Sequence, residues 1–125
     1  MKIEGKVVHG KHLGRTIGFP TANLQPEGKW RFEETGVWAA WFLVDGQKLP
    51  CMVNIGRHPT VPDGPATIEA HIFDYQGDLY GRAACVETVA FLRGEVRFGD
   101  VSELRAQLER DKIQSLHILS GGGID

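Results

Sequence analysis

The chain has 125 residues, of which 42% are hydrophobic and 24% charged, and its formal net charge is −2 at pH 7. These values predict one folded domain with a real core, and they exclude nucleic acid as the main partner because phosphate backbones require a large basic surplus. The longest apolar run, GVWAAWFLV, is about half the length that a bilayer span needs, so no membrane association is predicted.

The compartment is predicted from the N-terminus and the cysteines. The opening stretch MKIEGKVVHG lacks the apolar region of a signal peptide. Cys51 and Cys85 stand in neither CxxC nor metal-finger spacing, so we expect two buried thiols in a reducing environment. A cytoplasmic protein is the resulting expectation.

Strand-like segments follow one another through most of the chain. They cover, in order, residues 2–10, 35–56, 66–81 and 82–94. The second segment contains two β-rich runs separated by Asp45-Gly46, a dipeptide typical of tight hairpin turns, and the third ends in a turn around Gly77. Short strands separated by Gly and Pro favour a small antiparallel barrel or a sandwich.

The hydrophobic period changes near the C-terminus. Asp100 and Glu103 form a plausible N-terminal capping pair, and apolar residues follow at helical spacing. This pattern predicts a helix over residues 101–119, whose apolar side comprises Val101, Leu104 and Leu108 and continues less regularly through Ile113 and Leu116. We therefore expect a domain of residues 1–119, with a helix packed on the strands, and a flexible tail of residues 120–125.

The stretch GRTIGFPTANL carries the first chemical signal. If the chain is extended there, Thr21 and Asn23 project to one side and offer two neutral oxygen ligands. Such a pair suits Mg²⁺ when nucleotide phosphates supply the negative charge, and Arg15 could face those phosphates beside a loop stiffened by Pro20. An ordinary turn explains the same residues, and the Walker A pattern of a phosphate-binding loop is absent from the sequence.

Six stretches, taken in order, resemble one family. They are GKVVHGKHLGRTIGFPTANL, GVWAAWF, NIGRHPT, IEAHIFDYQGDLYG, FLRGEVRF and LRAQLERD. Together they resemble the riboflavin kinase (flavokinase) family, which includes the kinase half of bacterial bifunctional riboflavin kinase/FAD synthetases. The resemblance implies an all-β fold, a six-stranded antiparallel Greek-key barrel with a C-terminal α-helix packed against it. It also implies transfer of the ATP γ-phosphate to the 5′-hydroxyl of riboflavin, giving FMN, with Mg²⁺ or, in some members, Zn²⁺.

The resemblance also implies roles for individual residues. Thr21 and Asn23 match positions that contact the metal and the ATP phosphates, Gly10 and Arg15 match nucleotide-contacting positions, and Glu69 matches the catalytic base. The residues that fall where relatives line the flavin pocket are Ile72, Asp74, Tyr80, Arg93 and Phe98. The sequence departs from the usual pattern of this last segment at Gly94 and Val96.

Simpler explanations exist for most of these residues. Glu69 could be an exposed strand glutamate, Tyr80 and Phe98 core aromatics, and Arg93 a partner in a surface salt bridge. Strand alternation places Ile72 on the face opposite Glu69, so a shared pocket would require a strand end, a bulge or backbone contacts.

Two functions of different classes are compatible with the sequence. The first is an ATP:riboflavin 5′-phosphotransferase, with riboflavin and ATP as substrates and a fused or separate FAD synthetase (adenylyltransferase) domain as partner. The alternative is a non-catalytic flavin-binding barrel, a carrier or sensor. The presence of Thr21, Asn23 and Glu69 favours the kinase, because a mere binder has no use for a metal site and a base.

Overall fold

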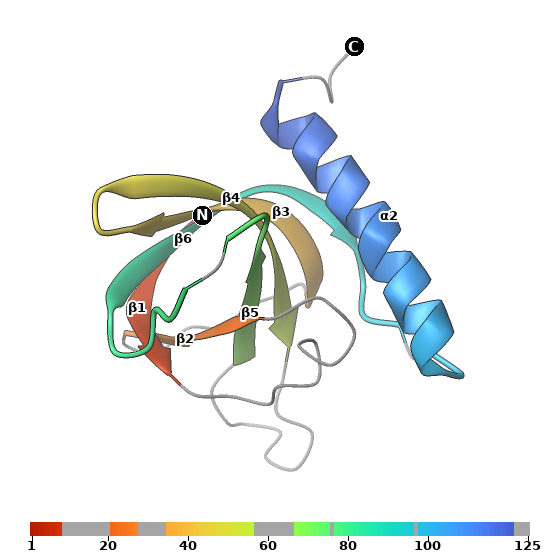
Figure 1. Ribbon diagram of the computed structural model, residues 1–125, viewed down its shortest axis with the longest axis horizontal. Coiled ribbons are helices and arrows are strands. Elements are labelled where there is room, and N and C mark those ends of the chain that lie inside the picture. The colour runs from red at the N-terminus through yellow and green to blue at the C-terminus, as the bar shows by residue number, and fades with distance from the viewer. Residues whose placement is uncertain (9–20, 28–34, 57–66, 76, 97, 122–125) are drawn as a thin grey trace.

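The computed structural model describes residues 1–8, 21–27, 35–56, 67–75, 77–96 and 98–121 (Figure 1). The described residues form six strands and one helix: β1 (Lys2–Val8), β2 (Ala22–Pro26), β3 (Gly36–Val44), β4 (Gln47–Gly56), β5 (Thr67–Ile72), β6 (Ala83–Arg93) and α2 (Val101–Leu119). The strands close into an antiparallel barrel in the order β1-β2-β5-β4-β3-β6, and α2 lies against one side of it (Figure 1).

This order confirms the predicted Greek-key barrel and excludes the sandwich. Strands β3, β4 and β5 are sequential neighbours, and β6 returns to lie beside β3. Three consecutive neighbouring strands with a fourth beside the first define the Greek key. Because β1 pairs with both β2 and β6, the sheet closes and its described strands leave no open edge.

The hairpin predicted at Asp45-Gly46 joins β3 to β4. Asp45 has φ 50° and Gly46 has φ 76°, so both central residues adopt the left-handed conformation of the tight turn that suits twisted strands. Val44 pairs with Gln47 directly across the turn, which fixes the register of the whole hairpin.

Strand β5 is shorter than the sequence pattern predicts. It ends at Ile72, although alternation continues through the next residues. The Phe73 N–H donates to the carbonyl of Pro50, and Asp74 then takes a left-handed φ of 54°, which turns the chain out of the sheet. The segment from Phe73 onward is therefore a connection leading to β6.

The barrel core consists of alternate residues that point inward from each strand. They include Ile3, Val7, Leu24, Phe42, Cys51, Val53, Ile55, Ile68, Ala70, Ile72 and Val86. Gly5 lets β1 pass close to β2, because a Cβ at this position would lie 2.2 Å from the Gln25 carbonyl oxygen. Both cysteines are free; Cys51 is buried as predicted, whereas the prediction of burial is wrong for Cys85, which is only partly covered.

Helix α2 has the predicted bounds and the predicted N-cap. The Glu103 N–H donates to Asp100 Oδ1 at 2.9 Å, and Glu103 Oε2 accepts from the Gly99 N–H at 2.8 Å. Ser120 and Gly121 close the C-terminus through N–H donation to Leu116 and Ile118, and the rest of the predicted tail lies outside the described residues.

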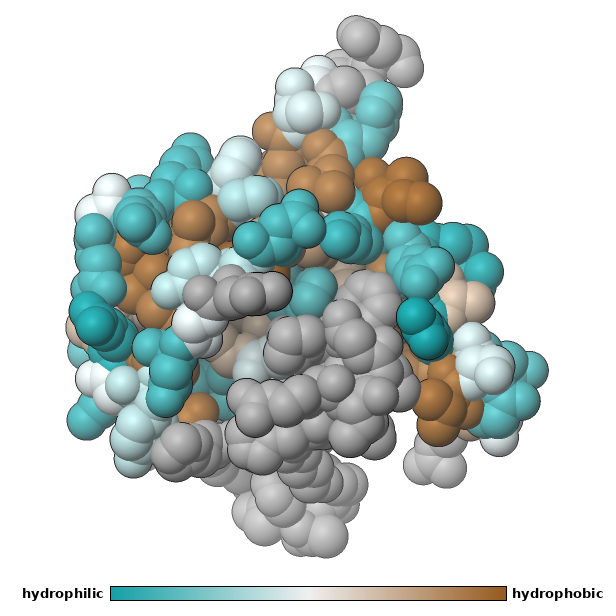
Figure 2. Space-filling model, viewed as in Figure 1, coloured by the Kyte–Doolittle hydropathy of each residue, from teal (hydrophilic) through white to brown (hydrophobic). Residues whose placement is uncertain are grey.

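The helix packs on the barrel through a second apolar cluster. Val37, Met52 and Phe73 form its buried part, and Leu92, Leu104, Leu108, Leu116 and Leu119 pack against them. The prediction that Val101 and Ile113 belong to this side is wrong, since they are 54% and 71% exposed. Figure 2 shows hydrophobic side chains where α2 meets the barrel and hydrophilic side chains over much of the remaining coloured face. Among the described residues, no helix combines the length and apolar character that crossing a bilayer requires.

Candidate functional site

A row of polar residues crosses three neighbouring strands on the outside of the barrel. Asn23 on β2 is the register partner of Glu69 on β5, and Glu69 is in turn the partner of Asn54 on β4. Directly opposed residues of antiparallel strands place their side chains on the same face, with Cβ atoms about 4.5–5.5 Å apart. Two amides therefore flank one carboxylate.

The neighbours along each strand show that the side chains of this row point to the outside of the barrel. Ile68 and Ala70 point into the barrel core on either side of Glu69, and Val53 and Ile55 do so on either side of Asn54. Glu69 and Asn23 are half-buried, whereas Asn54 is exposed. Glu69 is thus a partly shielded carboxylate on the outer face, which differs from the freely exposed strand glutamate that its residue type most often is.

The predicted metal and phosphate ligands lie at the start of this row. Thr21 directly precedes β2 and is half-buried, and Asn23 projects to the outer face because Ala22 and Leu24 contact the core. Their hydroxyl and amide oxygens are ligands that suit Mg²⁺. Among the described residues, no three His, Cys, Asp or Glu side chains gather into a metal site. Because the hydroxyl of Thr21 and the amide oxygen of Asn23 carry no charge, this donor set fits a divalent ion that arrives with phosphate oxygens. Gly10 and Arg15 lie outside the described residues.

The same row continues across β3 to Arg93 on β6. Asn54 pairs with Val37, and Val37 pairs with Arg93, next to a register shift. The guanidinium of Arg93 forms an ion pair with Asp111 of α2 at 2.7 Å and lies 5.8 Å from the centre of the Phe98 ring. The two predicted flavin residues Arg93 and Phe98 are thus together. The Arg93 side chain is 18% exposed, so its ion pair is mostly buried and not the surface pair considered from the sequence.

The structure places the other three predicted flavin residues apart from this group. Ile72 points into the barrel core, on the face opposite Glu69, as strand alternation predicts. Asp74 is exposed in the turn after β5, with its Oδ1 3.7 Å from Lys112 Nζ of α2. Tyr80 is 54% exposed, so it is no core aromatic. The turn that contains Tyr80 is hydrogen-bonded to β1, because the Gly81 N–H donates to the Val7 carbonyl. The next residue of β1, Val8, is the register partner of Asn23, so this turn lies near the Asn23 end of the row.

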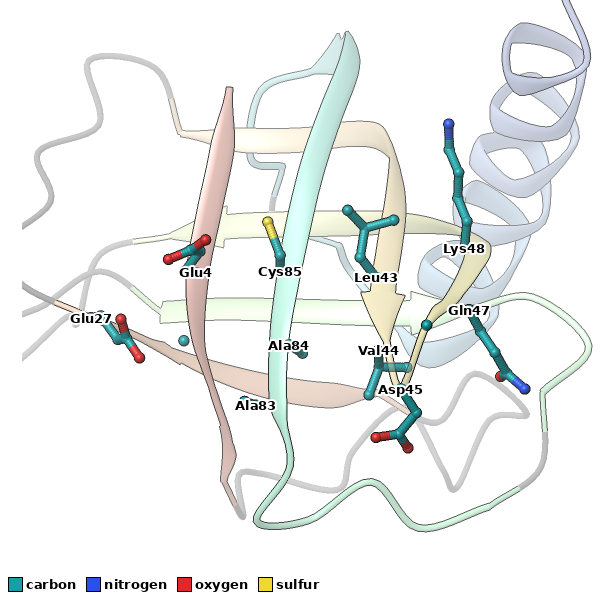
Figure 3. A pocket seen from close by; sticks show the side chains of 12 residues that line it. Glu4, Glu27, Leu43, Val44, Asp45, Gln47, Lys48, Ala83, Ala84 and Cys85 are labelled. Carbon is teal, nitrogen blue, oxygen red and sulfur yellow. The ribbon is translucent and has the colours of Figure 1, made fainter.

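A cavity of about 590 Å³ lies elsewhere on the barrel. Figure 3 shows Glu4, Cys85 and Leu43 side by side on β1, β6 and β3 within it, close to the β3–β4 turn. Strand β6 is three places from β5 in the closed barrel order, so this groove and Glu69 lie on opposite sides. Partial burial, and then repulsion by Glu4, raise the pKa of the Cys85 thiol, which disfavours a reactive thiolate there. Of the predicted site residues that the structure describes, none lines this cavity.

Two residues of the site escaped the sequence analysis. Asn54 is one exposed asparagine in a strand, and its place beside Glu69 depends on a register that a single sequence does not display. Asp111 is a buried carboxylate on the inward side of α2. A charged residue between Leu108 and Leu116, at an inward position of an amphipathic helix, was the signal that could have found it.

Comparisons with known proteins extend over nearly the whole chain. The family model described as Flavokinase: Riboflavin kinase matches residues 1–119. The chain is 46% identical over 112 residues to the bifunctional riboflavin kinase/FMN adenylyltransferase of Escherichia coli (strain K12), a match that covers 89% of this chain and 36% of the relative. The chain thus spans a little over a third of that relative's length.

Two solved structures share the fold. One is the crystal structure of a macrolide-efflux protein from Streptococcus pneumoniae, with a TM-score of 0.84 and 33% identity over 91% of this chain and 38% of that chain. The other is riboflavin kinase from Trypanosoma brucei, with a TM-score of 0.66 and 21% identity over 95% of this chain and 79% of that chain. The second likeness concerns the fold alone. The barrel with its C-terminal helix is therefore an architecture found in other solved proteins.

Proposed function

The chain belongs to the riboflavin kinase (flavokinase) family, and we propose that it transfers the γ-phosphate of ATP to the 5′-hydroxyl of riboflavin, which produces FMN. The observation that carries this proposal is the direct opposition of Asn23 and Glu69 across β2 and β5. It brings a proposed ligand of the nucleotide and metal next to a proposed base, although the two residues lie far apart in the sequence.

In the proposed reaction Glu69 orients the 5′-hydroxyl and accepts its proton as the new P–O bond forms. Phosphoryl transfer proceeds through a loose transition state, so alignment of donor and acceptor matters more than covalent chemistry by the protein. General-base assistance of this kind is worth about 10²–10⁴ in rate. Asn54, on the other side of Glu69, is placed to hold the carboxylate or a nearby hydroxyl of the substrate through its amide.

The nucleotide side of the site is proposed on Gly10, Arg15, Thr21 and Asn23. Thr21 and Asn23 would hold Mg²⁺, or Zn²⁺, together with phosphate oxygens, and a divalent ion neutralises charge on the transferring group when bound. Arg15 and the backbone at Gly10 would contact the ATP phosphates. The Thr21 hydroxyl and the Asn23 amide position ATP, the phosphate donor, while Glu69 positions riboflavin, the phosphate acceptor.

The flavin side is proposed on Arg93 and Phe98, with Asp74, Tyr80 and Ile72 as further contacts. The guanidinium of Arg93 lies over the Phe98 ring, 5.8 Å from its centre, at the far end of the Glu69 row, and a flat heterocycle could pack against these two groups. No observation favours the alternative of a non-catalytic flavin-binding barrel, since a carrier or sensor does not require the amide–carboxylate row.

For the protein as a whole, we propose a catalytic unit of residues 1–119 that acts in the cytoplasm. The E. coli relative also carries FMN adenylyltransferase in its name, so a fused or separate adenylyltransferase is the proposed partner. The described elements, six strands and one helix, include no separate α/β nucleotide-binding unit, so we expect residues 1–119 to make FMN and not FAD.

The test is direct. The purified chain is incubated with riboflavin, ATP and Mg²⁺, and FMN is separated from riboflavin by chromatography; reactions with CTP, with Zn²⁺ and with a chelator run in parallel. FMN that accumulates only with a nucleoside triphosphate and a divalent ion supports the proposal. Riboflavin recovered unchanged under all of these conditions refutes it.

A further inference from the structure

Helix α2 holds a buried carboxylate against the barrel. Asp111 is 1% exposed and accepts hydrogen bonds from three directions. Arg93 Nε donates to Oδ1 and Oδ2 at 3.1 Å each, Arg93 Nη2 donates to Oδ2 at 2.7 Å, and Gln107 Nε2 donates to Oδ1 at 2.9 Å. Burying an unpaired carboxylate would be costly. Here each oxygen of the Asp111 carboxylate accepts hydrogen bonds from donors of Arg93 or Gln107, which offset that cost.

The same contacts fix Arg93. Its fork is held edge-on by Asp111, Nη1 donates to the Gly94 carbonyl at 3.1 Å, and its central carbon lies over the Phe98 ring. A guanidinium that is hydrogen-bonded along one edge and lies over an aromatic ring has little freedom to rotate. The Arg93–Phe98 pair is therefore preformed, and α2 determines its orientation.

Attachment of the helix does not require this network. Four leucines of α2 already pack against the barrel, on the Val37–Met52–Phe73 cluster and beside Leu92 of β6. A buried ion pair is often no more stabilising than apolar residues of similar volume, because removing both charges from water offsets their attraction. A charged pair in this interface is thus better explained by the geometry that it imposes than by stability.

A second contact of α2 agrees with this explanation. Lys112, the next residue along the helix, reaches Asp74 at 3.7 Å and lies 5.9 Å from the centre of the Phe73 ring. Adjacent residues of α2 therefore contact Arg93 at the end of β6 and Asp74 after β5, two of the proposed flavin contacts, although the exposed Lys112–Asp74 pair is the weaker of the two contacts.

We infer that Asp111 is a positioning residue for riboflavin: it holds Arg93 over Phe98 so that the pair forms one wall for the flat flavin ring. This inference rests on the function proposed above and assigns α2 a part in substrate affinity. Asp111 acts through Arg93 and does not itself touch the substrate.

The primary experiment compares Asp111→Asn with Glu109→Gln. Glu109 lies on the same helix but in an exposed pair, 3.7 Å from Arg105, and serves as the matched control. Loss of a charge-assisted hydrogen bond predicts a rise in KM for riboflavin of about 10-fold for Asp111→Asn, with KM for ATP changed by less than about 2-fold. The control should leave both constants unchanged.

A double variant separates positioning from stability. Arg93→Met combined with Asp111→Leu replaces the ion pair by apolar side chains, which should preserve folding as judged by circular dichroism and Tm. We expect this folded variant to show a KM for riboflavin raised at least as much as in Asp111→Asn. Should Asp111→Asn not fold, Gln107→Ala supplies the measurement of positioning, because it removes one donor to the Asp111 carboxylate and keeps Arg93.

The outcomes are distinct. A wild-type chain that makes no FMN overturns the proposed function itself. A wild-type chain that makes FMN, with variants of wild-type KM for riboflavin, overturns only the positioning role and leaves Asp111 as a structural residue. Equal increases in KM for ATP and riboflavin also overturn it, because a general distortion of the barrel would affect both substrates.

Discussion

Asn23 and Glu69 lie directly opposite each other on strands β2 and β5, and both side chains point to the outside of the barrel. Neither residue could reach the other without the Greek-key order, which places β2 beside β5 and not beside β3. The pairing of β2 with β5 thus places the proposed nucleotide ligand, Asn23, next to the proposed base, Glu69.

Replacing Glu69 by glutamine should separate binding from turnover. The amide keeps the size of the side chain but cannot accept the proton of the 5′-hydroxyl, so kcat should fall by about 100-fold or more. The affinity for riboflavin, measured by quenching of flavin fluorescence, should change little. A Glu69→Gln enzyme that turns over at nearly the wild-type rate would remove Glu69 from the mechanism.

Replacing Thr21 or Asn23 by alanine should act on the nucleotide side. Each change removes one neutral oxygen from the proposed ion site, so the KM for Mg-ATP should rise by about 10-fold while the affinity for riboflavin is retained. Titration with Mg²⁺ at fixed ATP gives the apparent metal affinity directly. If instead both variants unfold and the refolded fraction binds Mg-ATP normally, the motif is structural.

Local signals in the sequence predicted much of the fold. Alternation, the Asp45-Gly46 turn and the Asp100–Glu103 cap each depend on residues close together in the chain, and the hairpin and the bounds of α2 agree with them. Ile113 was misplaced because nine residues separate it from Leu104, and at about 100° per residue the two point to opposite sides of the helix.

The site was predictable only in part. Resemblance to a family named Asn23 and Glu69, but the place of Asn54 beside Glu69 follows from the register of strands distant in sequence, which alternation alone does not set. The burial of Asp111 has the same origin, since its partner Arg93 comes from another element. A pattern of apolar residues identifies which side of an element is inward, and it does not identify which polar residues meet there.

The place of Asn54 beside Glu69 leads to a further prediction. Asn54→Ala removes an amide that can hold the carboxylate or a substrate hydroxyl, so kcat/KM for riboflavin should fall by about 10-fold. Gln25→Ala is the matched control, because Gln25 is an exposed amide two residues beyond Asn23 on the same strand. Steady-state kinetics on both variants decide the matter: equal activities would show that the amide at Asn54 has no part in the site.

Cys51 should make the protein sensitive to alkali. Burial raises the pKa of this thiol from 9.0 to about 12 in the folded protein. Above pH 9 the unfolded chain releases the proton while the folded chain retains it, so ionisation favours unfolding. The contribution is absent below pH 9 and grows by about 1.4 kcal/mol per pH unit as the pH rises toward 12.

Cys51→Val isolates this effect, because the variant keeps an apolar side chain in the barrel core and has no thiol to ionise. Urea unfolding is measured for both proteins at pH 7 and pH 10, and the difference between them removes the contributions of lysines and tyrosines. The free energy of unfolding should fall less for Cys51→Val than for the wild type, by about 1.4 kcal/mol at pH 10. Parallel losses in the two proteins would mean that the thiol ionises as readily in the folded barrel as in the unfolded chain.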